Sequence, residues 1–575
     1  MSHFQQTWAS IIIEELIRCG VEAFCIAPGS RSTPLTLAVS QHPQVHSTVH
    51  YDERGCGFVA LGYARATGKP SVIITTSGTA VANLFPAVIE AYQSQVPLIV
   101  LTADRPPEYQ ETGANQSIPQ HQLFGAFTRW CAAVPCPDFH VKPAVLLTTV
   151  DQAVFKAIHL PGGPVHINCM FREPFIGQEK DHRVGVWRGG VKEWKTSAKP
   201  FTEYSVPEIS CQLDLSELAN NVKEKQGIIL VGEIRDSEDR KGILELAEGL
   251  GWPIYPSITS GLCSKDHPLV VQSYDAFVTH YPELFNPEVV IQLGAHIISK
   301  KIDTLISEKQ PYLVQVMPHG NRQDPSHSAS FRVTSSIKSF CDTLTLQLDA
   351  SSKKMPDILE AAKKVRQSID KCVNQDTLTE PLATRIVSRT IPEGHGLFLA
   401  NSLPVRLMEL LSVSRSGEVA IAANRGASGI DGTIASAVGY ALGKQSQVTC
   451  LIGDLSFCHD MNSLSLLKAA RYPVVFVVLN NNGGGIFSLL PIVEEKKVYQ
   501  RFFQVGQDMD FQSAASQFGV SYYQPKGPDA FEEVYKESCH LGESAIIEVQ
   551  VPHDSTQQFY HQLADHIRHH SKVQS

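Results

Sequence analysis

Hydrophobic residues along this chain form short continuous runs that alternate with stretches of helical periodicity. Residues 8–18 carry apolar side chains at helical spacing and stop before Gly20, which predicts an amphipathic helix. Buried strands are predicted at residues 24–27, 71–75 and 98–102, with helical patterns between them. Strands that are apolar on both faces and alternate with helices indicate a parallel sheet covered on both sides.

The same alternation recurs in two later parts of the chain. The further strands are predicted at 227–232, 289–294, 312–316, 396–400, 419–422, 448–452, 474–479 and 545–549. Because 575 residues exceed what one hydrophobic core supports, several domains are expected. We predict an α/β protein of three doubly wound parallel-sheet domains, spanning 1–180, 205–348 and 375–575.

Three further segments differ from this pattern. Residues 177–207 are polar and irregular, which predicts a linker, and residues 350–374 predict a charged helical connector. The C-terminal segment carries four histidines, His561, His566, His569 and His570. A solvated terminal helix accounts for them better than a metal site does, because the partners of a closed site are missing.

Composition excludes several classes of protein. The net charge of -9 leaves no basic footprint, so we expect no nucleic-acid partner. No apolar run approaches the ~20 residues of a membrane span, and the N-terminus lacks the basic region of a signal peptide. The 13 cysteines are dispersed without a Cys-x-x-Cys pair, which is typical of reduced thiols. We therefore expect a cytoplasmic protein.

The sharpest motif pair lies on one predicted crossover of the third domain. Gly453 and Asp454 follow the strand at 448–452, and the Asn-rich and Gly-rich run 480–485 follows the strand at 474–479. A helix between two parallel strands places both motifs at the carboxyl edge of the sheet, where ligands bind. Asp454 and Asn481 should therefore be neighbours in space.

The residue types of this pair suit magnesium and a diphosphate. A carboxylate, an amide oxygen and a free carbonyl are hard oxygen ligands, so Asp454, Asn481 and Gly483 are the predicted metal ligands. The glycines let the backbone approach phosphate oxygens and offer free N–H groups. Each half alone is also a common turn after a strand, so the prediction depends on both halves together.

Two other phosphate-binding motifs fail. Residues 439–445 are one position short of a P-loop and lack its hydroxyl residue. No Gly-x-Gly-x-x-Gly follows a strand, which argues against a nicotinamide oxidoreductase.

The motif pair resembles the diphosphate-binding motif of thiamine diphosphate enzymes. The resemblance implies that the third domain holds the diphosphate, that the first holds the pyrimidine, and that active sites lie between two chains. It makes Glu53, in the first turn of a helix, the catalytic acid that hydrogen-bonds the pyrimidine, with a pKa raised by burial. It makes Ile430 the apolar wedge that bends the cofactor. The implied cofactor-binding residues are Glu53, Ser428, Ile430, Gly453, Asp454, Ser456, Asn481 and Gly483, with Mg²⁺ or alternatively Mn²⁺ as the ion.

Several motifs together resemble one family, the 2-succinyl-5-enolpyruvyl-6-hydroxy-3-cyclohexene-1-carboxylate synthases of menaquinone and phylloquinone biosynthesis. They lie at residues 27–35, 52–55, 102–108, 401–406, 424–432 and 480–491. The resemblance implies decarboxylation of 2-oxoglutarate and addition of the product to isochorismate. Both substrates are dicarboxylates, which suits loop arginines because the guanidinium binds a carboxylate through two hydrogen bonds.

The resemblance also assigns the substrate-binding residues. Ser30, Arg31, Arg105, Gln116 and Lys300 would hold isochorismate, and Gln116 is also a catalytic candidate. Ser402, Arg406 and Arg425 would hold the carboxylate derived from 2-oxoglutarate, and Ile486, Phe487 and Leu490 would wall the pocket. The weak alignment around Lys300 leaves Lys301 as an alternative. Pro119 distinguishes the Gln116 loop from the family pattern.

Two alternatives stay open. The first is another thiamine diphosphate enzyme, either a 2-oxo-acid decarboxylase or an acetolactate-type carboligase. Such enzymes act on monocarboxylates and would not need so many loop arginines. The second is a non-catalytic protein that keeps the cofactor fold, which the presence of Glu53, Asp454 and Asn481 argues against. We expect a homodimer or homotetramer.

Overall fold

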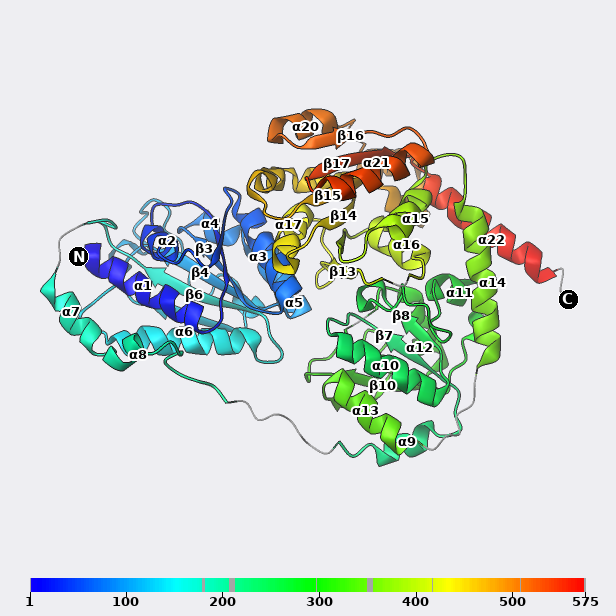
Figure 1. Ribbon diagram of the computed structural model, residues 1–575, viewed down its shortest axis with the longest axis horizontal. Coiled ribbons are helices and arrows are strands. Elements are labelled where there is room, and N and C mark those ends of the chain that lie inside the picture. Colours follow the sequence, from blue (N-terminus) through cyan, green and yellow to red (C-terminus); the bar gives the residue numbers. More distant parts are fainter. Residues whose placement is uncertain are drawn as a thin grey trace. The chain divides into compact units, whose positions relative to one another are not determined.

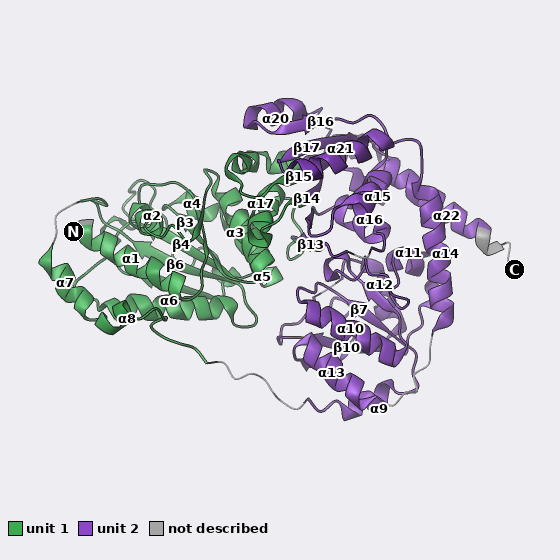
Figure 2. Ribbon diagram, viewed as in Figure 1, with its two compact units in different colours: residues 1–206, 424–448, 456–474 green, residues 207–423, 449–455, 475–575 purple. Residues whose placement is uncertain are grey.

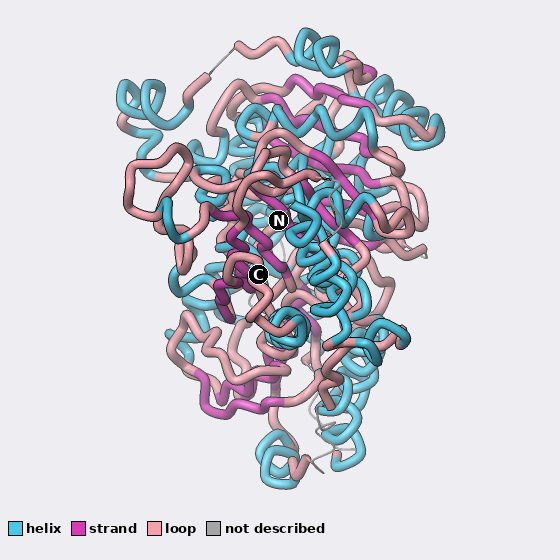
Figure 3. Tube along the Cα trace, turned by 90° about the vertical axis from the view of Figure 1, so that its left-hand side faces the viewer, coloured by secondary structure: helices cyan, strands magenta, loops and turns pink. Residues whose placement is uncertain are grey.

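Three β-sheets form the framework of the protein, and the strands of each alternate with helices along the chain (Figures 1 and 3). The computed structural model describes residues 2–177, 181–205, 213–295, 297–348, 355–415, 417–506 and 508–572. The predicted α/β class with three parallel sheets is confirmed. No helix in these described ranges has both the length and the apolar content needed to cross a membrane.

The first sheet has the strand order β2-β1-β3-β4-β6-β5, and its strand pairs are parallel. Its strands are β1 (Ala23–Ile26), β2 (His46–Val49), β3 (Ser71–Thr75), β4 (Leu98–Asp104), β5 (Trp130–Val134) and β6 (Pro164–Met170). The accompanying helices are α1 (Ser2–Arg18), α2 (Thr33–Ser40), α3 (Glu53–Thr67), α4 (Thr79–Ala82), α5 (Phe85–Ser94) and α6 (Pro143–Ile158). The predicted strands β1, β3 and β4 are buried along their whole length.

The second sheet has the order β11-β10-β9-β7-β8. Its strands are β7 (Gly227–Val231), β8 (Ile254–Pro256), β9 (Val289–Leu293), β10 (Tyr312–Met317) and β11 (Ala329–Thr334). Its helices are α9 (Ser216–Val222), α10 (Ser237–Leu250), α11 (Tyr274–His280), α12 (Lys300–Lys309) and α13 (Ile337–Gln347). The predicted strands β7, β9 and β10 again form the interior of the sheet, which is why their sequences are continuously apolar.

The third sheet has the order β13-β12-β14-β15-β17-β16. Its strands are β12 (Gly396–Leu399), β13 (Ala420–Ala423), β14 (Val448–Gly453), β15 (Val474–Asn480), β16 (Ser521–Tyr523) and β17 (Ala545–Gln550). Its α-helices are α15 (Glu380–Thr390), α16 (Leu403–Leu411), α17 (Thr433–Lys444), α18 (Asp454–His459), α19 (Lys496–Tyr499), α20 (Phe511–Phe518), α21 (Pro528–Leu541) and α22 (Ser555–Lys572). The helical segment predicted between β14 and β15 consists of α18 and a 3₁₀ helix, Met461–Ala469.

The segment between the first and second sheets corrects one prediction. The stretch expected to be an irregular linker contains helices α7 (His182–Gly189) and α8 (Lys192–Thr196). Their tryptophans, Trp187 and Trp194, are buried, and Trp187 stacks on Trp8 of α1 with ring centroids 5.5 Å apart. Apolar side chains that are sparse in sequence thus suffice to hold two short helices against α1.

The terminal helix α22 is not solvated on all sides. Phe559, Leu563 and Ile567 are buried and belong to the same core as α14 (Pro356–Val373). This spacing is one apolar stripe of an amphipathic helix. Helix α14 is the predicted charged connector, of which residues 350–354 lie outside the described residues.

Two compact units describe the packing of the chain (Figure 2). Unit 1 consists of residues 1–206, 424–448 and 456–474, and unit 2 consists of 207–423, 449–455 and 475–575. The first sheet lies in unit 1, and the second sheet lies in unit 2 together with most of the third. Helix α17 follows β13 in sequence but packs with unit 1.

Helices α3 and α17 approach each other closely through glycines. A Cβ on Gly62 of α3 would lie 2.1 Å from the Ser436 carbonyl oxygen, and a Cβ on Gly439 of α17 would lie 2.0 Å from the Val59 oxygen. Both distances are far inside van der Waals contact, so only glycine fits at these two positions. The helix that begins with Glu53 is therefore held by backbone-to-backbone contact with α17.

Replacing Gly62 with alanine should open this helix pair. We expect Gly62→Ala to lower the free energy of unfolding by about 1–3 kcal/mol, because the added methyl group overpacks a site with no free volume. The matched control is Gly185→Ala in α7, where an added Cβ meets no atom within 4 Å. The control should be neutral or stabilising by up to about 1 kcal/mol, as alanine is in helices. The measurement is the first thermal unfolding midpoint, and equal midpoints for the two variants would contradict the expectation.

Candidate functional site

The two predicted diphosphate motifs meet at the carboxyl edge of the third sheet. Strands β14 and β15 are neighbours in this sheet, and Asp454 and Asn481 directly follow them. The Oδ2 atom of Asp454 accepts a hydrogen bond from the Gly483 N–H at 2.8 Å, and Oδ1 accepts one from the Leu455 N–H at 2.7 Å. The expected spatial proximity of the two motifs is thus confirmed.

The oxygen atoms at this edge are buried and only partly satisfied. Asp454 is 6% exposed and Asn481 is 5% exposed. Burial raises the pKa of the Asp454 carboxyl, while the backbone N–H groups of Gly483 and Leu455 oppose that shift. Among the described residues, the Oδ1 atom of Asn481 has no hydrogen-bond partner. A buried amide oxygen that receives no hydrogen bond, next to a carboxylate, fits a site for a divalent cation. Such a cation would be coordinated by both groups.

Gly483 fits the predicted third position for two reasons. Its φ of 135° is a conformation that L side chains rarely adopt, and an added Cβ would lie 1.9 Å from the Gln504 carbonyl oxygen. The Gly483 carbonyl accepts a hydrogen bond from the Gly485 N–H at 3.0 Å and retains a second lone pair. Gly453 is the last residue of β14, directly before Asp454.

Glu53 is the first residue of α3, as predicted. Asp52 caps this helix by accepting a hydrogen bond from the Arg54 N–H at 3.0 Å. The Glu53 carboxyl accepts a hydrogen bond from the Asn83 amide at 3.4 Å and is half-buried. The full burial expected for this acid is therefore not reached in the single chain.

The loop 424–432 carries three of the predicted site residues. Arg425, Ser428 and Ile430 lie on it, and Ser428 has a φ of 60°. The hydroxyl of Ser456 donates to the Ile430 carbonyl oxygen at 3.0 Å, so this predicted cofactor residue supports the loop. Ile430 itself is only half-buried, which leaves its side chain available for contact with a ligand.

A cavity of about 470 Å³ lies beside this loop and the first turn of α3. Its lining includes Arg54, Phe58, Asn424, Gly429 and Asp431. The loop thus borders open space near the predicted catalytic acid, within unit 1.

Arg31 and Arg105 share one acidic partner. Arg31 is 3% exposed and donates to the Phe171 carbonyl oxygen at 2.9 Å and to Glu173 at 3.0 Å. Arg105 lies 3.8 Å from the same Glu173 carboxylate. Burial and the charge of Arg105 lower the pKa of Arg31. The structure therefore places two predicted substrate-binding arginines around one carboxylate, that of Glu173.

Gln116 lies on an exposed loop over Gly78. Its φ is 55°, and its Cα would lie 3.3 Å from a Cβ built on Gly78. Gln120, 1% exposed, anchors this loop by accepting from the Gly78 N–H and donating to the Ala103 carbonyl oxygen. Ser30 lies on the exposed loop between β1 and α2.

The remaining polar site predictions lie at helix starts. Ser402 precedes α16 with a φ of 73°, and its carbonyl oxygen accepts from the Arg406 guanidinium at 2.6 Å. Lys300 is the exposed first residue of α12 and is followed by the equally exposed Lys301. The structure gives no reason to prefer one lysine over the other.

The three predicted apolar wall residues differ in exposure. Ile486 packs on the core that contains α16, and Phe487 forms an edge-to-face contact with Phe503 at 5.4 Å. Leu490 is 48% exposed. Ile486 and Phe487 therefore have apolar neighbours in the described chain, while about half of the Leu490 side chain is exposed.

Residues that support the site were missed in the sequence. Glu90 of α5 is buried and accepts hydrogen bonds from the Gly426 N–H at 2.8 Å and the Ala427 N–H at 2.7 Å. Glu380, the first residue of α15, accepts from the Asn481 amide at 2.9 Å. Burial raises the pKa of Glu380 to about 7. Glutamates at helical positions are ordinary in sequence, and only the fold reveals these partners.

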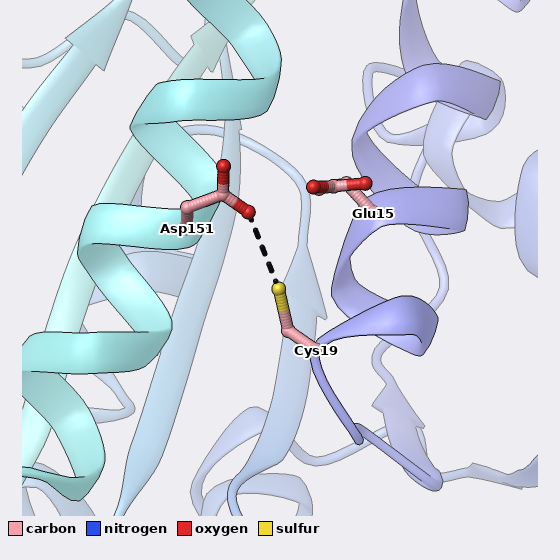
Figure 4. Close-up of side chains that lie close together, drawn as sticks. All are labelled: Glu15, Cys19 and Asp151. Atoms are coloured by element: carbon pink, nitrogen blue, oxygen red, sulfur yellow. Dashed lines mark hydrogen bonds between the residues drawn. The ribbon is translucent and has the colours of Figure 1, made fainter. Parts of the chain in front are cut away.

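A cluster of acids and a thiol in unit 1 resembles a metal site but is an anchor (Figure 4). Glu15 and Cys19 come from α1 and its end, and Asp151 comes from α6. Asp151 accepts from the Cys19 thiol at 3.4 Å and from the Thr202 N–H at 2.9 Å. Glu15 accepts from the Trp194 indole and the Phe201 N–H. Two of the four carboxyl oxygens thus hold the segment after α8, a third holds α8 itself through Trp194, and the fourth joins α6 to Cys19 after α1.

Comparisons with known proteins define the class. Three family models match in sequence order, and together they cover most of the chain. They are "Thiamine pyrophosphate enzyme, N-terminal TPP binding domain" at residues 6–123, "Middle domain of thiamine pyrophosphate" at 185–399, and "Thiamine pyrophosphate enzyme, C-terminal TPP binding domain" at 406–549. The protein is a thiamine diphosphate-dependent enzyme.

Close relatives narrow this class to one family. The chain is 40% identical to the 2-succinyl-5-enolpyruvyl-6-hydroxy-3-cyclohexene-1-carboxylate synthase of Rubrobacter xylanophilus, over 94% of this chain and 95% of that protein. It is 39% identical to the synthase of the same name from Salinibacter ruber, over 97% and 95%. It is 41% identical to that of Chlorobaculum tepidum, over 94% of each. The chain belongs to this family.

The Glu15 anchor should make stability depend on pH. Burial, reinforced by Asp151, raises the pKa of Glu15 to about 8 from 4.5, so the folded protein retains a proton that the unfolded chain loses. Stability should therefore be highest below about pH 4.5 for this group and fall towards pH 8, by at most about 1.4 kcal/mol per pH unit.

The measurement is the unfolding midpoint of unit 1 between pH 5.5 and pH 8. We expect Glu15→Gln to flatten this decline, because glutamine has no proton to lose. Glu14→Gln, on the partly exposed face of the same helix, should leave the slope unchanged. If the unfolding midpoint fell with pH equally in wild type and Glu15→Gln, the raised pKa of Glu15 would not be the cause of the decline.

Proposed function

We propose that this enzyme decarboxylates 2-oxoglutarate and joins the resulting succinyl carbanion equivalent to isochorismate. Carbon dioxide leaves, pyruvate is retained as the enol ether, and the product is 2-succinyl-5-enolpyruvyl-6-hydroxy-3-cyclohexene-1-carboxylate. The relatives' name gives this product, and we propose that the reaction belongs to menaquinone or phylloquinone biosynthesis. The observation that carries it is the edge at Asp454 and Asn481, where two buried side chains offer oxygen ligands and the Asn481 Oδ1 has no hydrogen-bond partner in the described part of the chain.

We propose that magnesium, or manganese, is bound at this edge by Asp454, Asn481 and the Gly483 carbonyl. These three residues would hold the ion, and its positive charge would offset the negative charge of the cofactor diphosphate. Thiamine diphosphate supplies a carbon nucleophile and an electron sink when bound. Gly453, Ser428, Ile430 and Ser456 complete the proposed cofactor contacts.

The residues of unit 1 then have separate tasks. Glu53 is proposed to hydrogen-bond the pyrimidine ring of the cofactor, and its carboxyl is only half-buried in the single chain, so this contact needs further cover from solvent. We propose that a second chain supplies this cover, so that the enzyme is a homodimer or homotetramer with active sites between chains. The proposed domains are 1–180, 205–348 and 375–575. The free thiols described in the chain suit the cytoplasm.

The proposed substrate-binding residues include positively charged side chains that suit the carboxylates of both substrates. Arg31, Arg105, Ser30, Gln116 and Lys300 are proposed to bind isochorismate. Glu173 marks the position where a carboxylate fits between the first two. The proposed contacts of the 2-oxoglutarate-derived carboxylate are Ser402, Arg406 and Arg425, with Ile486, Phe487 and Leu490 as apolar wall.

Turnover tests the reaction directly. With 2-oxoglutarate, thiamine diphosphate and Mg²⁺ present, we expect loss of isochorismate and release of one carbon dioxide per turnover. Glu53→Gln should lower kcat at least about 100-fold, because glutamine cannot share a proton with the pyrimidine. Glu193→Gln, in the first turn of α8, is the matched control and should keep full activity. Decarboxylation that leaves isochorismate untouched would instead favour another thiamine diphosphate carboligase or decarboxylase.

Arg31→Lys tests the carboxylate site. Lysine keeps the charge but cannot form the two directed hydrogen bonds of the guanidinium, so KM for isochorismate should rise about 10- to 100-fold. The KM for 2-oxoglutarate should stay within about threefold. Arg183→Lys changes a similarly paired but exposed arginine and should leave both constants unchanged. An equal rise of both KM values would indicate general damage instead of a lost isochorismate contact.

A further inference from the structure

A buried glutamate contacts the proposed metal ligand Asn481. Glu380 is 2% exposed and is the first residue of α15, whose start is capped by Thr379. Its Oε1 atom accepts a hydrogen bond from the Asn481 Nδ2 at 2.9 Å, and its Oε2 atom accepts one from the Thr556 hydroxyl. Both carboxyl oxygens therefore act as acceptors.

This contact fixes the direction of the Asn481 amide. The nitrogen and the oxygen of a primary amide lie on opposite sides of its carbon, so a nitrogen committed to Glu380 sends the oxygen the other way. The reversed amide would place its oxygen against an acceptor. The oxygen so directed is the buried Oδ1 that lacks a partner among the described residues.

The backbone of Asn481 is held independently. The Asn481 carbonyl oxygen accepts from the His553 Nδ1 at 2.9 Å, and the His553 Nε2 is hydrogen-bonded to the Tyr499 hydroxyl at 2.7 Å. With the main chain fixed on this side, rotation of the side chain is the remaining freedom. Glu380 removes that freedom.

The neighbouring Asn480 provides an internal comparison. Its Nδ2 donates to Glu548 at 2.7 Å, and Glu548 is also 2% exposed and accepts from the Tyr522 hydroxyl. The Oδ1 of Asn480, however, accepts from the Asn482 N–H at 3.0 Å. Two consecutive asparagines are thus each held by a buried glutamate, but only at Asn481 is the amide oxygen left for a ligand.

We propose that Glu380 is a positioning residue that orients the Asn481 amide oxygen toward the divalent cation. This rests on the proposed metal site. Outer-shell partners of metal ligands typically change metal affinity 10- to 100-fold when they are lost. Glu548 holds Asn480 in the same way but should not affect the cation.

The test separates orientation from charge with three variants of the full-length enzyme. Glu380→Asp keeps the charge and shortens the reach. Glu380→Gln keeps the reach, because its oxygen can still accept from Asn481 while its nitrogen faces Thr556. Glu548→Asp is the matched control. The probe is Mn²⁺, titrated with saturating thiamine diphosphate and followed by the electron paramagnetic resonance signal of free Mn²⁺.

We expect Glu380→Asp to weaken Mn²⁺ binding about 10- to 100-fold, and Glu380→Gln and Glu548→Asp to stay within about threefold of wild type. If Glu380→Gln weakened Mn²⁺ binding as much as Glu380→Asp does, the negative charge of Glu380 would be what matters, and the positioning role would be wrong. Wild-type affinity in Glu380→Asp, or an equal loss in Glu548→Asp, would also overturn it. If wild type itself bound no Mn²⁺ with the cofactor present, the proposed metal site would fail, and the inference with it.

Discussion

The hydrogen bond between the Asp454 carboxylate and the Gly483 N–H joins the ends of two neighbouring parallel strands. Parallel strands place their carboxyl ends at one edge of the sheet, so motifs separated in sequence by a helix meet there. Gly483 permits this contact because its φ and its proximity to the Gln504 carbonyl exclude a side chain. The proposed cation, the orientation of Asn481 and the supporting role of Glu380 all depend on this junction.

Buried acids recur as supports of the functional loops. Glu380 holds Asn481, Glu90 holds the backbone of the loop 424–432, and Glu15 with Asp151 holds the segment after α8. An unpaired buried carboxylate is costly, so each is stabilised by several N–H or O–H donors. The donors are mostly backbone N–H groups or amide side chains. The carboxyl groups therefore fix loop geometry at defined points inside the fold, and Glu90 also pairs with the buried Arg65 at 3.1 Å.

The chain was most predictable where burial was complete. The central strands β3, β4, β7, β9, β14 and β15 were read directly from their apolar runs. The missed strands β2, β5, β8, β11 and β16 all lie at sheet edges. Of these, β2, β11 and β16 mix polar with apolar residues, as partly exposed edge strands do. Strand β8 is only three residues long, and β5, although apolar in sequence, is only partly buried. Strand β6 is internal, but His166 and Asn168 interrupt its apolar pattern because they join a buried polar network with Thr102.

The sequence by itself determined the fold class and the meeting of the two diphosphate motifs, because strand periodicity and parallel connections act through local pattern. The family came from the resemblance of its motifs. Tertiary structure alone decided which ordinary residues became supports. Nothing near Glu90 or Glu380 in sequence distinguishes them from surface glutamates, since their partners lie far along the chain. It likewise decided that His182–Gly189 and Lys192–Thr196 form helices on α1, through the burial of Trp187 and Trp194. Such partnerships are contacts of folded surfaces, which no local pattern encodes.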